Sequence, residues 1–140
     1  MAHQPRDRGR PAGRPEAQSR PTGQTAGDGS RLATYRDGAN HLRPELFDGE
    51  ARAEAERWRG VKASQLRRFY GAVRGHVRKL DLDPDAPDGD SRVSMALLKA
   101  SATYAAARER SHAPIRDFFE HHAALVGNAR DYRDFARHFE

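Results

Sequence analysis

The chain has 140 residues, of which 36% are hydrophobic and 32% are charged, and its formal net charge at pH 7 is +5. This length allows one domain at most, and the absence of cysteine excludes disulfides and thiolate metal sites. No apolar run is long enough to span a bilayer, and the first residues lack the apolar core of a signal peptide. We therefore expect a soluble, cytoplasmic protein with no membrane partner.

Residues 1–43 are predicted to form a disordered tail. Arg, Pro and Gly recur there, and large apolar residues are nearly absent before Leu32, so the segment buries too little surface to offset its ordering entropy. Residues 1–44 hold eight arginines and four acidic residues, whereas residues 45–140 hold 17 basic and 16 acidic residues. Such a tail either adds loose affinity for nucleic acid or is a dispensable extension, and the sequence leaves both open.

Residues 44–140 are predicted to form the folded domain. A first helix is expected from Glu45 to Trp58, where alanines favour helix but apolar anchors are few, so this helix should lie across the bundle. A second helix follows, with Ser64 as a candidate N-cap, and it runs to Leu80. The acidic, proline-bearing segment 81–90 is expected to be a loop.

Three further helices are predicted towards the C-terminus. The third starts at Ser91 or Ser94 and runs to about Arg110, with an alanine-rich centre that allows neighbouring helices to approach closely. The fourth has Pro114 at its first position and ends at Gly127-Asn128, and the fifth occupies residues 129–140. With no strand signal, the pattern predicts an all-α fold, a small bundle of about five helices. The core stripe of the fourth helix comprises Ile115, Phe118, Phe119, His122, Leu125 and Val126.

The second helix has two unlike faces. Its apolar residues recur at helical spacing, while its cations lie outside that stripe and no Asp or Glu occurs between Val61 and Leu80. Exposed helix faces usually mix charge signs. Unpaired cations along one helix are either simply solvated or typical of nucleic-acid binding, and we favour the second interpretation. The apolar stripe comprises Leu66, Phe69, Tyr70, Val73, Val77 and Leu80, and the cations are Arg67, Arg68, Arg74, Arg78 and Lys79.

No pattern indicates catalysis, a metal or a cofactor, so we expect a protein that is not an enzyme. The run Asp81-x-Asp83-x-Asp85 begins like a calcium loop, but Ala86 and Arg92 stand where that loop needs Gly and Glu. Glu120-His121-His122 lacks the spacing that places two zinc ligands on one helix face. Because His122 falls on an apolar stripe, we expect it to be a core histidine.

Three blocks of sequence together resemble a known family. Residues 64–74 (SQLRRFYGAVR), 97–108 (LLKASATYAAAR) and 132–140 (YRDFARHFE) resemble, in order and spacing, the small subunit of type III-A CRISPR (Csm) interference complexes. The resemblance covers about residues 44–140. It implies a non-catalytic subunit that stacks in several copies along the guide–target duplex and binds the RNA backbone without sequence specificity in antiviral defence. The implied partners are guide (crRNA) and target RNA, the CRISPR backbone and large subunits, and further copies of itself.

The resemblance also implies which residues bind RNA. Arg68 and Arg108 have an alternative, because each is able to pair with an acidic residue such as Glu109, Asp117 or Glu120 instead. Tyr70 and Tyr104 fall on apolar stripes, so we expect them in the core rather than as base-stacking platforms. The implied RNA-binding residues are Lys62, Arg67, Arg68, Arg74, Arg78, Lys79, Lys99 and Arg108.

Two other functions compete with this interpretation. A helical protein-interaction module, such as an adaptor or antitoxin, would use the basic helix to dock an acidic partner. A DNA-binding regulator is disfavoured because the predicted loop after the second helix is about ten residues, longer than the turn of a helix-turn-helix motif. For contacts between copies, the acidic first helix is our candidate.

Overall fold

The computed structural model describes Arg31 and residues 33–140, so the part of the predicted tail at 1–30 and 32 lies outside the described residues. Within the described range the chain forms five α-helices and two short 3-10 helices and no β-strand, which confirms the all-α prediction. The elements are η1 (Pro44–Phe47), α1 (Gly49–Arg57), α2 (Ala63–Leu82), α3 (Asp88–Arg108), η2 (Arg110–His112), α4 (Ala113–Leu125) and α5 (Ala129–Phe139).

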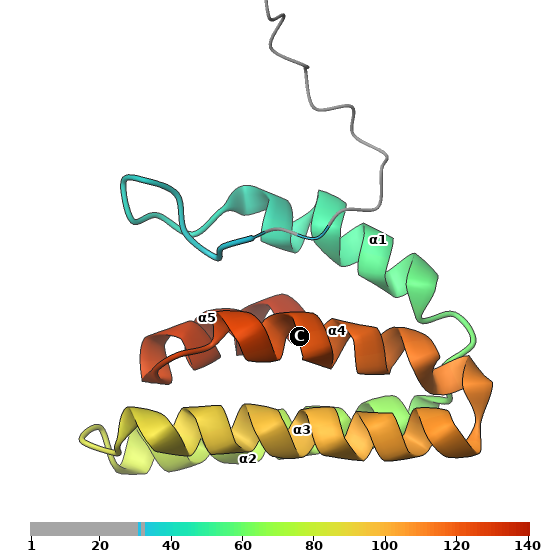
Figure 1. The fold of residues 1–140 in the computed structure, drawn as a ribbon. Coiled ribbons are helices and arrows are strands. Elements are labelled where there is room, and N and C mark those ends of the chain that lie inside the picture. Colours follow the sequence, from blue (N-terminus) through green and yellow to red (C-terminus); the bar gives the residue numbers. More distant parts are fainter. Residues whose placement is uncertain (1–30, 32) are drawn as a thin grey trace, which may run out of the picture.

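The helices are stacked in layers (Figure 1). The chain up to α1 forms one outer layer, α4 and α5 form the middle, and α2 and α3 form the other outer layer. The two long helices run side by side, and polar contacts join the end of α2 to the start of α3, including His76 Nε2 to Ser91 Oγ at 3.1 Å. The α2–α3 pair thus has one face on the core and one face open to solvent.

The largest buried side chains of the core are aromatic and come from α4 and α5. Phe118, Phe119 and Phe135 are completely buried, and Trp58 from the end of α1 packs edge-on against Phe118 with 4.9 Å between ring centroids. The predicted stripe of the fourth helix is confirmed, although Leu125 is only partly buried. The first predicted helix, Glu45 to Trp58, is divided at Asp48 into η1 and α1; as expected, it has few apolar anchors and lies over the bundle rather than inside it.

Several helix boundaries differ from those predicted. Lys62 occupies the N-cap of α2 and makes no side-chain cap, so Ser64 lies within the first turn and its predicted capping role is wrong. The acidic segment was predicted to be a loop, but α2 continues to Leu82 and α3 begins at Asp88. The carboxylates of Asp88 and Asp90 lie in the first turn of α3, where they complement the positive end of the helix dipole. Acidic residues there favour helix rather than loop.

Residues 33–43, which we call the strap, pack against the middle layer. Tyr35 is only 4% exposed, and its hydroxyl bonds to His122 Nδ1 at 2.7 Å. Arg36 makes two hydrogen bonds to Asp134, at 2.7 and 3.0 Å. The sequence placed the start of the domain at residue 44, whereas the packed chain begins earlier.

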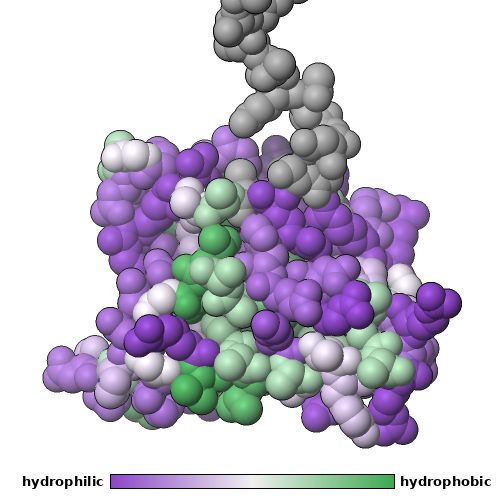
Figure 2. All heavy atoms as spheres, viewed as in Figure 1, coloured by the Kyte–Doolittle hydropathy of each residue, from purple (hydrophilic) through white to green (hydrophobic). Residues whose placement is uncertain are grey.

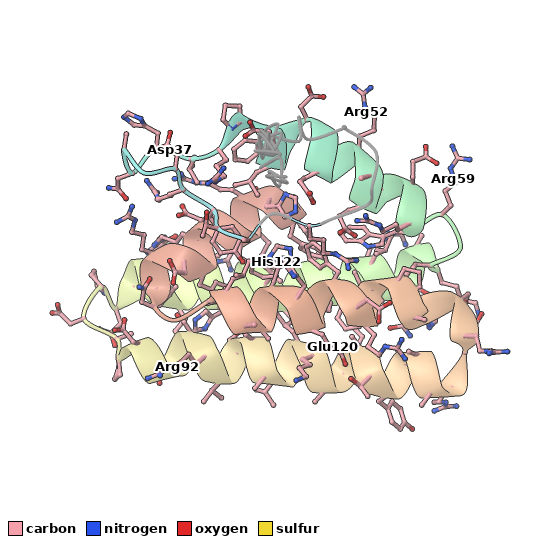
Figure 3. All side chains as sticks on the ribbon, turned by 45° about the horizontal axis from the view of Figure 1, so that its top comes forward. Asp37, Arg52, Arg59, Arg92, Glu120 and His122 are labelled. Atoms are coloured by element: carbon pink, nitrogen blue, oxygen red, sulfur yellow. The ribbon has the colours of Figure 1, made fainter. Side chains whose placement is uncertain are left out.

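His122 is a core histidine, as predicted. It lies at the centre of the molecule between the strap and α5 (Figure 3), stacked on Tyr35 with 5.6 Å between ring centroids. Burial, aided by the neighbouring His138, lowers the pKa of His122 to about 2. The imidazole is therefore neutral at every pH at which the protein is expected to be folded.

Candidate nucleic-acid interface

The cations of α2 form two rows rather than one face. Successive residues of an α-helix lie about 100° apart around its axis, so Arg67, Arg74 and Arg78 fall within about 40° of one another. We call these three the outer row. Arg68 and Lys79 fall on the other flank of the helix, about 110° from the outer row, and face α3.

The outer row is exposed and only partly neutralised. Arg74 Nη1 pairs with Glu140 Oε1 at 2.7 Å, and about half of the arginine side chain remains accessible. Arg67 and Arg78 are exposed and pair with no acidic residue in the described part of the chain. Because residues 61–80 contain no Asp or Glu, Arg67 and Arg78 remain as unpaired charge on the surface of this helix, as the sequence predicted.

An ion pair lies at each end of the flank of α2 that faces α3. Lys79 Nζ lies 3.1 Å from Asp90 Oδ2, and Lys62 Nζ lies 2.8 Å from Glu109 Oε2. Hydrogen bonds from Lys62 and then Ser111 lower the pKa of the Glu109 carboxyl. Both lysines are therefore paired within the chain, although their side chains remain 61% and 58% exposed.

Between these two ion pairs lie Arg68 and Arg108. The sequence allowed each to pair with Glu109, Asp117 or Glu120, but neither forms an ion pair with any described residue. Arg108 instead donates from Nη1 to the hydroxyl of Tyr104 at 3.1 Å, and its guanidinium carbon lies 5.6 Å from the centre of that ring. Two cations thus remain available along the α2–α3 seam.

A concave surface follows this seam. A groove of about 600 Å³, which we call the seam groove, lies between α2 and α3 next to η2. A smaller groove of about 230 Å³ continues along the same two helices. Arg68 and Ser101 line both. The seam groove is also lined by Gln65, Tyr104, Arg108, Glu109 and His112.

Both tyrosines predicted to be buried are exposed. Tyr70 is 45% and Tyr104 is 64% accessible, because Tyr70 lies at the margin of the buried face of α2, whereas Tyr104 lies about 150° around α3 from the buried residues of that helix. Val93 and Leu97 of α3 are exposed as well. Figure 2 shows apolar side chains gathered in a band across the face on which α3 lies. The core prediction for Tyr70 and Tyr104 was wrong, and both rings are available to a partner.

Lys99 is separated from the other predicted site residues. It lies nine residues before Arg108, which is about 180° around α3. Because Arg108 lines the seam groove, Lys99 lies on the far side of the helix. It is exposed and pairs with no acidic residue among those described, but it does not extend the strip of cations in the way the sequence suggested.

Gln65 and His112 were not singled out from the sequence. They lie on different elements, 47 residues apart in the sequence, and they line the same groove only because of how η2 packs against α2.

Among the described residues no group of three or more His, Asp or Glu is arranged to hold a metal ion. No helix in that part of the chain is long and apolar enough to cross a membrane.

The fold and this surface define a small all-α protein with segregated, partly unpaired positive charge. A family model described as Csm2 Type III-A matches residues 41–140, which is most of the chain. The chain belongs to this family and is a small subunit of a type III-A CRISPR complex, which contains other subunits and RNA. No curated protein and no solved structure gives a significant match. The family match begins within the strap, at residue 41.

Proposed function

We propose that this chain is the non-catalytic subunit that holds the RNA backbone in its complex, in several copies along the guide–target duplex. The observation that carries the proposal is the outer row, in which Arg67 and Arg78 are exposed and have no acidic partner among the described residues. Arginines near the strap, by contrast, pair with buried carboxylates. Charge left unpaired on a rigid helix is available to an anion.

The geometry of the outer row suits a polyanion. Arg67 and Arg78 are eleven residues apart, which corresponds to about 16 Å along the helix axis. A row of this length contacts successive phosphates without reading bases. In an RNA-guided complex, base pairing with the guide supplies the sequence specificity, and the protein recognises backbone and shape. Repetition of the subunit multiplies modest contacts through effective concentration.

The exposed apolar residues of α3 support a second kind of contact. Val93 and Leu97 of this helix are exposed, and contiguous exposed apolar surface is typical of protein–protein contacts. In the assembly this face would meet a neighbouring protein subunit. The same observation favours the alternative function, a helical interaction module that docks a single protein partner.

The proposal is tested by removing the outer row. Replacing Arg67, Arg74 and Arg78 together by Ala should weaken RNA retention and reduce the slope of log affinity against log salt by about 2–3, since each phosphate contact contributes about 0.7–0.9 to that slope. Helicity should not change, because none of these side chains is buried. RNA binding is measured at several salt concentrations, and helicity by circular dichroism.

A matched control variant removes the same charge elsewhere. Arg52, Arg59 and Arg92 are exposed and extend outward from α1, from the turn after it and from α3 (Figure 3). Their triple replacement by Ala should leave the salt slope almost unchanged. If the outer-row variant binds RNA as tightly as the control variant, the outer row is only solvated and the proposal fails.

A further inference from the structure

The floor of the seam groove contains polar atoms that lack hydrogen-bond partners. Both ring nitrogens of His112 and Oε1 of Gln65 are shielded from solvent, and none of them bonds to a described residue. His112 is only 3% exposed, and both residues line the groove. Buried polar atoms are nearly always paired, because an unmet hydrogen bond is costly. The floor therefore points to a ligand that brings its own donors and acceptors.

The walls of the groove are cationic. Arg68 from α2 and Arg108 from α3 line it, and neither pairs with an acidic residue in the described range. Glu109 also lines the groove, but its carboxylate is paired with Lys62 at 2.8 Å and accepts a hydrogen bond from Ser111 at 3.1 Å. The walls consequently favour an anionic group, such as a phosphate.

The rim of the groove is aromatic. Tyr104 is largely exposed, and the guanidinium of Arg108 lies against its ring. Aromatic rings and guanidinium planes are the surfaces on which unpaired nucleotide bases stack. One ligand class combines a stacking surface, a hydrogen-bonding edge and an anionic group, and that class is the nucleotide.

We propose that the seam groove binds a single unpaired nucleotide of RNA, with its base towards Gln65 and His112 and its phosphate at Arg68 and Arg108. This inference rests on the proposed function, which brings RNA to the α2–α3 layer. A base within a duplex has its pairing edge occupied, so the ligand is a base outside the duplex. The groove volume, about 600 Å³, falls within the range of about 300–1,000 Å³ typical of small-molecule sites.

The unpaired atoms are shielded in the free protein, so the base reaches them only when a side chain that lines the groove moves. Tyr104 and Arg108 are exposed and are bonded to each other. They are able to rotate together without disturbing the core. Binding is therefore expected to change the environment of Tyr104 as well as that of His112.

The test is a titration of the full-length, isotopically labelled chain followed by NMR, with AMP, UMP and inorganic phosphate as separate probes. Both nucleotides are expected to shift the His112 ring nitrogens and the Gln65 side-chain amide saturably. Inorganic phosphate should shift the arginine signals alone. Equal shifts of the His112 and Gln65 signals with phosphate would reduce the site to an anion hole and overturn the proposal. No shift of these signals with either nucleotide would overturn it as well.

Variants at the exposed rim avoid the risk of unfolding that a change at His112 would carry. Tyr104→Ala should weaken AMP binding at least about tenfold, as expected for loss of one stacked base, and Tyr104→Phe should largely keep it. The matched control is Tyr70→Ala, which removes an exposed tyrosine outside the groove lining and should leave AMP binding unchanged. If Tyr104→Ala binds AMP like the control, the base does not stack there and the proposal fails.

The outcome is separable from that of the proposed function. The outer-row triple variant keeps the whole groove lining, so it should bind AMP normally while losing affinity for long RNA. Normal AMP binding without any long-RNA binding by the parent chain would contradict the proposed function and leave the groove assignment intact. Long-RNA binding without AMP binding would contradict the groove assignment and leave the proposed function intact.

Discussion

Arginines on the two sides of the bundle have opposite environments. On the strap side, Arg31 Nε lies 2.5 Å from Glu54 Oε1, and Arg36 binds Asp134 through two nitrogens. Glu54 and Asp134 are each only 2% exposed. On the α2–α3 side, Arg67 and the groove arginines are exposed and form no ion pair with any described residue.

Whether an arginine pairs with a buried carboxylate indicates whether its charge serves folding or remains available to a ligand. A buried carboxylate is unfavourable unless a cation pairs with it, so Arg31 and Arg36 are needed by Glu54 and Asp134. Removing an exposed, unpaired arginine leaves no buried charge behind and should hardly affect stability. The net charge of the chain does not distinguish these two groups, whereas their partners do.

The largest expected effect concerns the core that both sides share. Phe118 contacts Trp58 at a ring-centroid distance of 4.9 Å and Phe119 at 5.5 Å, and it is completely buried. Phe118→Ala should lower the free energy of unfolding by about 3–5 kcal/mol, measured by urea denaturation. Leu125→Ala, at a partly buried position, should cost less. A negligible change for Phe118→Ala would mean that this stripe faces a partner instead of the core.

The next largest effect concerns the ion pair between Arg36 of the strap and Asp134 of α5. Asp134→Asn leaves Arg36 without its charged partner and should destabilise the protein by about 2–3 kcal/mol, less than for a fully buried pair because the arginine is partly exposed. RNA binding of the folded variant should not change. The matched control is Asp81→Asn, whose carboxylate pairs with Arg133 at 2.5 Å on the surface and should cost no more than about 0.5 kcal/mol. Equal losses of stability for Asp134→Asn and Asp81→Asn would show that the buried pair on the strap side contributes no more to folding than a surface pair.

The smallest expected effect is a pH dependence from His122, which the strap covers. Its pKa is about 2 in the folded protein and about 6.5 in the unfolded chain. Below pH 6.5 the unfolded state therefore binds a proton that the native state does not, and stability falls as pH falls. Between pH 7 and pH 5 this contributes a loss of about 2 kcal/mol.

His122→Gln keeps a hydrogen-bonding side chain beside Tyr35 but does not titrate. Its unfolding free energy, measured by denaturant titration at pH 7, 6 and 5, should show a pH slope smaller by this contribution of about 2 kcal/mol. The variant is expected to be less stable than the parent at pH 7, so the slope and not the absolute stability is the readout. Identical slopes for variant and parent would show that His122 binds protons equally in the folded and the unfolded protein, which would contradict its lowered pKa.

Much of the fold followed from local sequence signals. The helical periodicity around Phe118 and the break at Gly127-Asn128 predicted α4 and α5. In the structure Asn128 caps α5 by accepting a hydrogen bond from the Asp131 backbone at 2.8 Å, a role that was not predicted. The strap was missed because Tyr35 is a lone aromatic residue in a polar segment, and its partner His122 lies 87 residues away. Periodicity within a segment carries no information on such long-range pairs.

The candidate site was predicted less completely. Charge sign and helical spacing located the outer row correctly on an exposed face, because both are local properties. The division between Arg67 and Arg68, the exposure of Tyr104 and the unpaired floor at His112 and Gln65 depend on how α3 and η2 pack against α2. These features became visible only in three dimensions.

We propose that the exposed arginines of α2 hold RNA in a multi-subunit complex. The test of this proposal is affinity purification of the tagged chain from its native cells, with and without ribonuclease, followed by identification of the bound proteins and RNA. We expect a multi-protein assembly that contains small RNAs of discrete lengths, and loss of RNA from the outer-row variant. Recovery of a single stoichiometric protein, without RNA and unaffected by ribonuclease, would contradict it.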